Sequence, residues 1–476
     1  MRPLVWFRSD VRVRDNTALS EACKIADDGV VAVFTICPVQ WSHHNWAPVK
    51  VDFLLRNLRK LSASLDEINI PLLIAEVPRF AQIPTRLLKI AETYSCDGIY
   101  FNREYELNER RRDEKVARVY ERAGKFVHSF TDQVVLPPES LKTTQGKTYT
   151  VFTPYKRKWI AAVKERGGVR CLRKPRKQKR LGREADVIPD RVDGFDGLKR
   201  PDLWKSGEKH AGRRLRSFIS QRLKSYERDR DFPVLNGTSA VSPYLALGVL
   251  SPRQCLHAAL KANRSRLDSG SKGATTWISE LIWREFYRHV LVGFPRVSMC
   301  EPFDLGATRI RWREDENDFR RWQEGRTGIP IVDAAMRQLE KTGWMHNRLR
   351  MVVAMFLTKN LFLDWRWGER HFMRNLVDGD LASNNGGWQW SASVGTDAAP
   401  YFRVFNPVRQ SERFDPKGDF IRQFVPELAN LKGKSIHLPH ERAAERIEAS
   451  GYPGPIVNLK ESRQRAIAEF KKWTSR

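Results

Sequence analysis

The sequence predicts a protein of two parts, an α/β domain followed by a larger all-α domain. Three observations lead to this fold class. Short apolar runs alternate with amphipathic stretches over residues 1–135, this pattern disappears over 136–205, and residues 206–476 show mostly helical spacing. Ten of the fifteen Trp lie in the last part. A chain of 476 residues is long enough to bury a large core in two or three domains.

The first domain is expected to contain five buried strands separated by helices. The strand-like runs are residues 3–7, 29–36, 70–77, 97–101 and 125–130. Helical periodicity lies between them at 50–66, 81–94 and 106–122. This alternation predicts a doubly wound, Rossmann-like parallel sheet with a ligand crevice at the carboxyl ends of its strands. Because no GxGxxG follows the first strand, the usual dinucleotide site is not expected.

Charge is the strongest signal in the composition. The chain has 84 Lys and Arg against 56 Asp and Glu, a formal net charge of +28. Such an excess favours a polyanionic partner, nucleic acid before an anionic membrane, with a generally basic surface as the alternative. The stretch 156–183 alone has thirteen basic residues and one acidic residue. We interpret it as part of a solvated interdomain linker that can also add to a positive field facing DNA.

The cysteines and the N-terminus indicate a cytosolic protein. The six Cys are far apart and form no CxxC motif or Cys/His cluster, which favours a reducing compartment and no structural metal site. The first residues, MRPLVWFRSD, have no apolar signal region. No run approaches the ~20 apolar residues of a membrane-spanning helix.

Two stretches combine polar side chains with large aromatic rings at helical spacing. Residues 275–290 place Trp277, Glu280 and Arg284 on one helical face, with a Trp–Tyr pair on the neighbouring face. In residues 344–357, Asn347, Arg350 and Met351 have the spacing i, i+3 and i+4, which also places them on one helical face. Glu and Arg among such rings are costly to bury without partners, so the pattern favours a ligand site over an ordinary core.

Two further segments have the chemistry of a ligand site. DGDLASNNGGWQWSASVGTDAAP (378–400) joins two Asp, paired Asn, paired Gly and two Trp. The Asn and Gly pairs favour a tight turn, and with the rings they suggest that the backbone approaches a flat ligand. GTSAVS (237–242) offers backbone N–H groups and hydroxyls of the kind that bind a diphosphate, although most such loops are ordinary helix N-caps.

Together, six motifs resemble those of the photolyase/cryptochrome family. They are VWFRSDVRVRDNTAL (5–19), YERDRDFP (226–233), SELIWREFYRH (279–289), GWMHNRLRM (343–351), DWRWGERHFM (364–373) and DGDLASNNGGWQWSASVGTDAAPYFRVFNP (378–407). The resemblance is closest to bacterial class I cyclobutane pyrimidine dimer (CPD) photolyases with a folate antenna. It implies a U-shaped FAD in the helical domain and light-driven electron transfer from fully reduced flavin to a pyrimidine dimer flipped out of DNA, which splits the dimer.

The resemblance assigns residues to the FAD pocket. They are Tyr226, Thr238, Ser239, Ala240, Val241, Ser242, Trp277, Glu280, Arg284, Asn347, Arg350, Asp378, Gly379, Asp380 and Asn384. Arg350 is expected to form an ion pair with Asp378. Asn384 is expected to face N5 of the flavin, where a neutral amide can turn either its oxygen or its NH₂ group toward the ring. Gly386 and Gly387 are expected to let the backbone close up on the flavin.

Other residues are assigned to electron supply and to DNA. The resemblance makes Trp388, Trp365 and Trp312 a chain that carries electrons from the surface to the flavin. The residues expected to bind DNA are Arg230, Glu280, Trp283, Asn347, Arg348, Met351, Trp390 and Arg403. Among them, Trp283 and Trp390 are expected to enclose the flipped dimer, and two aromatic faces can each supply ~1–3 kcal/mol of stacking.

Three features favour CPD repair over related functions. Asn384 stands where plant-type cryptochromes are expected to have Asp and animal cryptochromes Cys. The stretch MHNRLRM has the single His346, whereas (6-4) photolyases are expected to have a His pair. No long tail follows the similar region, which ends at about residue 455. A blue-light receptor and a (6-4) photolyase remain the alternatives, and a monomer is expected.

The resemblance also implies an antenna pigment, 5,10-methenyltetrahydrofolate. His44, Asn108 and Glu109 match its site. However, Ser298 and Met299 stand where a Cys-Lys pair is expected. The lost cation would weaken contact with the glutamate tail of the folate, and a deazaflavin is the alternative pigment.

Overall fold

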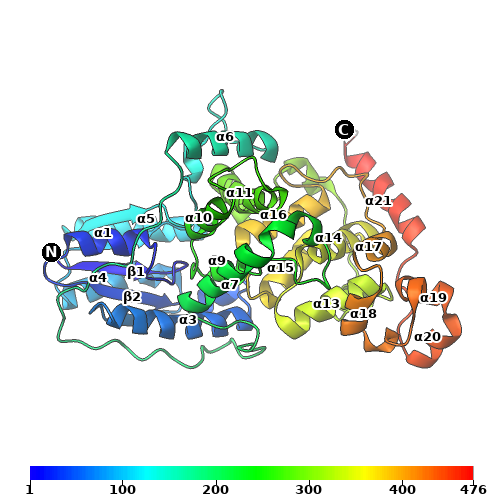
Figure 1. The fold of residues 1–476 in the computed structure, drawn as a ribbon, viewed down its shortest axis with the longest axis horizontal. Helices are drawn as coiled ribbons and strands as arrows, with labels where there is room; N and C mark the ends of the chain where they lie inside the picture. Colours follow the sequence, from blue (N-terminus) through cyan, green and yellow to red (C-terminus); the bar gives the residue numbers. More distant parts are fainter. Residues whose placement is uncertain (475–476) are drawn as a thin grey trace. The chain divides into compact units, whose positions relative to one another are not determined.

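The structure, a computed structural model, describes residues 1–474 (Figure 1). The chain forms two compact units. The first unit comprises Met1–Lys224, Ser239–Ser298 and Val377–Asp380, and the second comprises Ser225–Thr238, Met299–Leu376 and the chain from Leu381 onward. Each unit is therefore assembled from segments far apart in the sequence.

A five-stranded parallel sheet forms the centre of the N-terminal part of the first unit (Figure 1). Its strands are β1 (Pro3–Phe7), β2 (Val31–Ile36), β3 (Leu72–Glu76), β4 (Gly98–Asn102) and β5 (Phe126–Phe130). Their order is β3-β2-β1-β4-β5, with Leu4 opposite Val31 and Pro3 opposite Gly98. The predicted doubly wound sheet is confirmed, and each strand lies within two residues of the predicted run.

Helices connect these strands. They are α1 (Thr17–Ile25), α2 (Pro38–His43), α3 (Pro48–Asp66), α4 (Ile83–Thr93) and α5 (Leu107–Arg122). α1 packs on β1 and β4, and α3 packs on β3. In α3 the buried residues Phe53, Leu54, Leu58, Leu61 and Leu65 recur at helical spacing, which explains why this stretch folds as an amphipathic helix.

The region after the sheet differs in part from the prediction. Residues 136–205 were expected to be irregular, but α6 (Phe152–Glu165) lies within them. Its buried Phe152, Tyr155, Trp159 and Val163 have helical spacing, and the abundant Lys and Arg around them hide this pattern in the sequence. Between Glu165 and Glu208 the chain has no further helix or strand.

The remaining helices of the first unit bring distant segments together. They are α7 (Glu208–Gln221), α9 (Ser242–Ala246), α10 (Pro252–Ala262) and α11 (Lys272–Gly293). α10 packs against both α7 and α11. It begins with a capping box in which the Ser251 hydroxyl accepts a hydrogen bond from the backbone N–H of Gln254.

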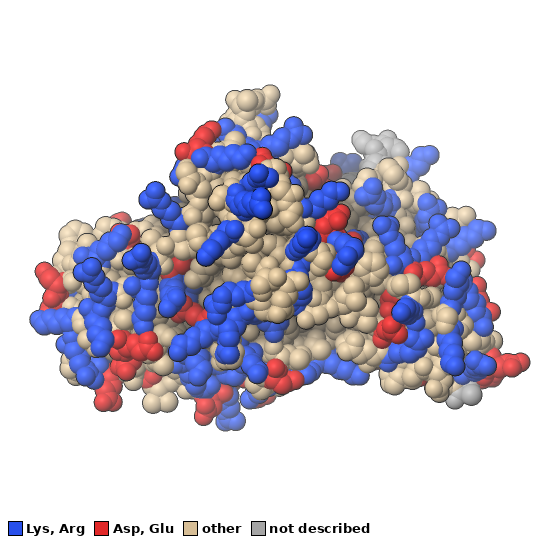
Figure 2. Space-filling model, in the orientation of Figure 1, with Lys and Arg blue, Asp and Glu red and all other residues tan. Residues whose placement is uncertain are grey.

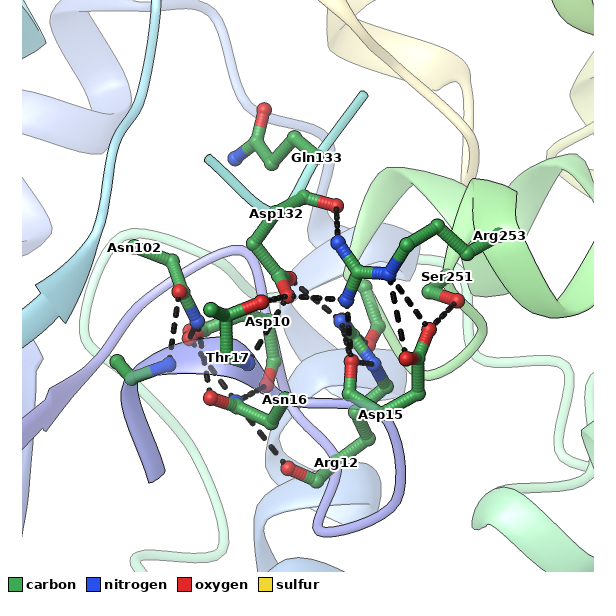
Figure 3. A network of polar contacts seen from close by, with 12 residues as sticks. Asp10, Arg12, Asp15, Asn16, Thr17, Asn102, Asp132, Gln133, Ser251 and Arg253 are labelled. Atoms are coloured by element: carbon green, nitrogen blue, oxygen red, sulfur yellow. Dashed lines mark hydrogen bonds and ion pairs between the residues drawn. The ribbon is translucent and has the colours of Figure 1, made fainter. Parts of the chain in front are cut away.

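A buried polar network joins the loop after β1 to the start of α10 (Figure 3). Arg253 forms ion pairs with Asp132 at 2.7 Å and with Asp15 at 3.1 Å. Arg12 also pairs with Asp132, and Ser251 donates to Asp15. Because both carboxylates are fully buried, they need these several donors to offset the loss of water. The network therefore fixes the start of α10 to the loops that follow β1 and β5.

The second unit is helical. Its helices are α8 (Tyr226–Asp229), α12 (Glu316–Gln323), α13 (Pro330–Thr342), α14 (Asn347–Met355), a π-helix (Phe356–Leu361), α15 (Trp365–Asn375), α16 (Leu381–Ala392), α17 (Pro407–Phe414), α18 (Asp419–Phe424), α19 (Pro439–Arg442), α20 (Ala444–Ser450) and α21 (Leu459–Thr474). α13 packs against α14 and α18, and α15 packs against α16. Trp322, Trp365 and Trp388 are buried in the core of this unit. The predicted combination of an α/β part with a helix-rich remainder is confirmed.

Candidate functional site

In the first unit, a half-buried cation lies against α9, the helix that follows the hydroxyl-rich loop. The Arg284 guanidinium on α11 donates to the carbonyl oxygens of Gln133 at 2.6 Å and Leu245 at 3.3 Å. Burial lowers the pKa of Arg284 to about 10, so it stays charged at neutral pH. Leu245 belongs to α9, which directly follows the loop, and Ala240 in that loop has a left-handed φ of 47°. A positive charge bonded to backbone carbonyls at this place suits a phosphate group.

Trp283 forms a supported aromatic platform on α11. Its ring stacks on Phe152 of α6 with centroids 3.7 Å apart and an interplanar angle of 9°. Tyr287, one turn along α11, lies 5.6 Å from the Trp283 ring, as the spacing predicted. Trp283 is half-buried. Phe152 covers one face of the indole and therefore fixes the plane in which the ring can stack on a base.

The Asp378–Asp380 segment is held by two cations of the first unit. Arg288 on α11 forms an ion pair with Asp380. Lys50 on α3 donates to the carbonyl oxygen of Gly379 at 2.7 Å, and its Nζ lies 3.9 Å from the centre of the Trp46 ring. Burial lowers the pKa of Lys50 to about 8. Sequence reasoning missed both Arg288 and Lys50, although Arg288 lies within the motif SELIWREFYRH.

In the second unit, Asn384 on α16 is held by Glu369 on α15. The Asn384 Nδ2 donates to the backbone oxygen of Glu369 at 3.0 Å and to its Oε1 at 2.9 Å. Burial raises the pKa of Glu369 to about 7. A turn of the Asn384 amide that presented its NH₂ group to a ligand would therefore break both hydrogen bonds to Glu369. Glu369 was also missed, although it belongs to the motif DWRWGERHFM.

The three Trp expected to carry electrons lie in one hydrophobic cluster of the second unit. Trp365 and Trp388 are buried, and Trp312 packs against the cluster while partly exposed. The Trp388 ring contacts Phe372 and Trp322 edge-on, with centroids 5.0 and 6.1 Å away. Gly368 makes this packing possible, because a Cβ there would lie 2.1 Å from the Trp388 ring.

Arginines expected to bind DNA meet around one carboxylate of the second unit. Arg348 pairs with Asp231 at 2.7 Å, and Arg230 lies 3.8 Å from the same residue. The Arg348 guanidinium also lies over the Phe414 ring at 4.5 Å, and its Nη1 lies 3.9 Å from the sulfur of Met351. The structure therefore brings Arg230, Arg348 and Met351 together. Arg403 lies apart on an exposed segment after α16.

The remaining residues that were predicted to bind FAD or DNA are buried, half-buried or at the start of a helix. Trp277 is buried against Phe218, and Tyr226 is buried under the guanidinium of Arg230. Asn347 begins α14, and Arg350 donates to the carbonyl oxygen of Met345 at 2.9 Å. Glu280 and Trp390 are half-buried.

The three residues expected to bind the antenna also meet. His44 Nδ1 lies 3.2 Å from Glu109 Oε1, and His44 Nε2 lies 3.3 Å from Asn108 Nδ2. Gln40 contacts the same ring nitrogen at 2.9 Å. Ser298 Oγ is buried without a hydrogen-bond partner, whereas Met299 is exposed.

Comparison with known proteins decides the family. Residues 3–175 match the family profile described as DNA photolyase, and residues 277–472 match the FAD binding domain of DNA photolyase. The chain is 43% identical to a deoxyribodipyrimidine photo-lyase of Vibrio cholerae, with 98% of this chain and 99% of that protein covered. The Escherichia coli protein of the same name is also 43% identical, with 98% of each covered. This chain belongs to the DNA photolyase family.

Solved structures of this family have the same fold. A class III photolyase from Agrobacterium tumefaciens matches with a TM-score of 0.89 and 34% identity, covering 100% of this chain and 98% of that one. A cryptochrome from Synechocystis matches with a TM-score of 0.84 and 30% identity, covering 98% and 99%. A photolyase and a cryptochrome therefore both have the architecture of this chain.

The residues present fit the FAD that this photolyase domain binds. Arg284 supplies a half-buried cation against α9, directly after the hydroxyl-rich loop, where a positive charge favours a diphosphate. The Asn384 amide is fixed with its NH₂ on Glu369, which leaves Oδ1 as the atom available to accept a hydrogen bond from a ligand. The FAD binding expected from the sequence is thus supported by both the family profile and the donor set.

The turn expected around Asn384–Gly387 is wrong. All four residues lie inside α16, which runs from Leu381 to Ala392. Two adjacent Gly cost about 1 kcal/mol each in a helix, so local propensity alone favours a turn. The packing of α16 against α14 and α15, with Trp388 buried, overrides that preference.

Two kinds of feature are absent from residues 1–474. No group of three or more His, Cys, Asp or Glu among them is arranged to hold a metal ion. No helix within this described part is long and apolar enough to cross a membrane.

Proposed function

We propose that the chain is a light-dependent DNA-repair enzyme, a deoxyribodipyrimidine photo-lyase that splits cyclobutane pyrimidine dimers in UV-damaged DNA. The observation that carries this proposal is 43% identity over 98% of the chain to proteins of that name. When bound, reduced FAD would supply the photoexcited electron that opens two carbon–carbon bonds of the dimer, and would take the electron back afterwards. The two pyrimidines are thereby restored without net redox change.

The chain's own residues bind and orient the partners of this reaction. Arg284 and the loop 237–242 would hold the diphosphate, and Asn384, fixed by Glu369, would accept a hydrogen bond at the flavin edge. Trp283, supported by Phe152, would stack on the flipped dimer. Stacking worth ~1–3 kcal/mol offsets part of the cost of flipping, which is low for a damaged base.

Electron supply and DNA contact are proposed for the other predicted residues. Trp388, Trp365 and Trp312 would carry electrons toward the flavin, and Glu280 would lie at the dimer. Arg230, Arg348 and Arg403 would bind phosphates, which is the sequence-independent part of the affinity. We further propose that the protein acts as a monomer in the cytosol and associates with the nucleoid when bound to DNA.

The proposed antenna is 5,10-methenyltetrahydrofolate. The support is the contact between His44, Glu109 and Asn108, three polar side chains of a kind that bind a pterin ring. Ser298 and Met299 provide no cation for its glutamate tail. A deazaflavin is the alternative, and extraction of the purified protein followed by absorption spectroscopy distinguishes the two pigments.

One assay tests the main proposal. Purified, reduced protein is incubated with an oligonucleotide containing one thymine dimer, in blue light and in the dark, and the dimer is counted by chromatography. We expect loss of the dimer in light only. Dimer that persists in light, with normal photoreduction of the flavin, would favour a blue-light receptor instead. Repair of (6-4) products alone would favour the other photolyase class.

A further inference from the structure

The segment after α6 is a row of exposed cations fixed to the first unit. We define the basic strip as Arg166, Arg170, Arg173, Arg176, Lys177, Lys179, Arg180 and Arg183, all of which are exposed. No acidic residue lies between Glu165 and Glu184. Figure 1 shows the segment within the long teal-to-green coil beside α3, and Figure 2 shows Lys and Arg spread over the visible face with fewer Asp and Glu among them.

The backbone of this segment is tied down at three places. Leu172 and Asp15 exchange two hydrogen bonds, of 2.8 and 3.2 Å. Gln178 donates from its N–H to the carbonyl oxygen of Ile68 at 3.0 Å, and its own carbonyl accepts from the Asn69 side chain at 2.9 Å. Asp15 belongs to the buried network of Figure 3, so the first attachment is anchored in the core of the unit.

The third attachment covers an edge of the sheet. β3 is an edge strand, and Asp186 donates from its N–H to the carbonyl oxygen of Leu72 at 2.9 Å. The Asp186 carboxylate accepts from the N–H of Ile74 at 2.9 Å. The segment therefore occupies hydrogen-bonding groups that an edge strand would otherwise leave open. These attachments distinguish the strip from a freely solvated linker, because they fix the chain that presents the cations.

Most of the strip's charge is not neutralised within the protein. Lys179 pairs with Asp28 at 2.7 Å and Arg183 pairs with Asp186 at 2.5 Å. The other six cations form no ion pair within residues 1–474. These six cations are exposed, and holding like charges together costs repulsion that an external polyanion would relieve.

We propose that the basic strip is a second nucleic-acid surface, which binds the phosphate backbone of undamaged duplex DNA independently of the lesion pocket. This inference rests on the proposed function, because an enzyme that repairs DNA encounters duplex DNA as its main polyanion. At ~3.3 Å per residue, the chain from Arg173 to Arg180 extends at most about 23 Å. That length corresponds to about seven phosphates of one strand. A fixed row of cations within this upper limit would hold the protein on duplex while it searches for a dimer.

The test compares two variants with the same change in charge. The strip variant carries Arg173→Gln, Arg176→Gln, Lys177→Gln and Arg180→Gln. The control carries Arg111→Gln, Lys115→Gln, Arg118→Gln and Arg122→Gln, four exposed cations of α5 in the same unit. Binding to an undamaged 30-base-pair duplex is measured in the dark at several salt concentrations, and circular dichroism verifies the fold of both variants.

We expect the strip variant to reduce the magnitude of the slope of log K against log[salt] by about 3.6, since each of the four lost phosphate contacts contributes about 0.9. The control should keep a slope close to that of the wild type. The ratio of affinities for dimer-containing and undamaged DNA should stay unchanged in both. If the slope of log K against log[salt] were the same in the strip variant and the control, binding would depend on net charge alone. That result would overturn the proposal.

Two other outcomes would also contradict it. A wild-type slope in the strip variant would show that DNA does not contact the strip. Loss of binding to phosphatidylserine vesicles with intact binding to duplex would assign the strip to a lipid surface. Binding to undamaged duplex is measured in the dark and depends on neither light nor flavin chemistry. A negative result there contradicts only the role of the basic strip. Failure of dimer repair is detected separately, by the assay of the wild type in blue light.

Discussion

Both N–H groups of the Asn384 amide are bound by a single residue, Glu369, through its backbone oxygen at 3.0 Å and its carboxyl Oε1 at 2.9 Å. The pair joins α16 to α15 in the core of the second unit. It leaves the amide oxygen as the group that Asn384 offers to a ligand. We therefore expect Asn384 to act as an acceptor held in place by Glu369, rather than as an amide that turns.

Asn384→Asp should therefore interfere with flavin reduction. The new carboxylate would lose both donated hydrogen bonds and face the Glu369 carboxyl, and its charge would oppose an added electron in a dry site. We expect photoreduction in blue light with a thiol reductant to stop before full reduction, and repair to fall, with dark DNA binding nearly unchanged. Spectra followed by a dimer assay measure both effects.

The double variant Asn384→Asp with Glu369→Gln is the matched control for this prediction. The Gln side chain can donate to the new carboxylate, so it should restore part of the photoreduction. A single Asn384→Asp variant with normal spectra would mean that Asn384 has no role at the flavin.

Glu369 should also make stability depend on pH. Burial raises its pKa from 4.5 to about 7, so the folded protein holds a proton that the unfolded chain releases. The stabilisation by this proton is complete below pH 4.5 and is lost as pH rises through 7, an effect on the order of 3 kcal/mol. Relative to Glu369→Gln, the free energy of unfolding of the wild type should therefore fall between pH 5 and 7.5. Urea titrations at each pH measure the difference, and a constant difference would show that Glu369 does not titrate in this range.

Trp388→Phe should block photoreduction of oxidised flavin, because Trp388 is the proposed link nearest the flavin. Repair by chemically reduced protein should persist, since that step needs no outside electron. Absorption spectra under blue light measure the first effect and a dimer assay the second. Trp322→Phe makes the same change at a buried ring 6.1 Å from Trp388 and should leave photoreduction intact. Equal loss in both variants would attribute the effect to packing of the core.

Trp283→Ala should weaken binding to dimer-containing DNA by ~1–3 kcal/mol and leave binding to undamaged duplex almost unchanged. The reason is that it removes lesion stacking and no phosphate contact. Phe152→Leu should cause a smaller loss in the same direction, because Trp283 loses the ring on which it stacks. Dark titrations with both DNAs test these expectations, and equal losses on the two DNAs would refute a lesion pocket at Trp283.

Arg403→Ala should instead weaken binding to damaged and undamaged DNA alike. The exposed arginine is proposed to contact a phosphate, so the salt slope should fall by about one unit. Arg374→Ala, an exposed cation on α15 that is not among the predicted DNA residues, is the control. An effect of Arg403→Ala on damaged DNA alone would place this residue at the lesion.

The strands, the amphipathic helices and the family could all be predicted from the amino-acid sequence. Strand-like runs such as 3–7 and helical runs such as 50–66 reappear as β1 and α3, because a continuous apolar run and a helical spacing of apolar residues are local properties that a short window contains. The family followed from six motifs whose residues the chain keeps in order.

Which distant residues meet is visible only in the folded chain. The tertiary structure placed the Asn384–Gly387 run in a helix, because packing of α16 outweighs the helix cost of two glycines. It also selected Glu369 as the partner of Asn384, Phe152 as the support of Trp283, and Asp15 as the anchor of the basic strip. Phe152 and Trp283 are separated by more than a hundred residues in sequence, as are Asp15 and Leu172. Such pairs depend on how whole elements pack together, and no local pattern in the sequence encodes that packing.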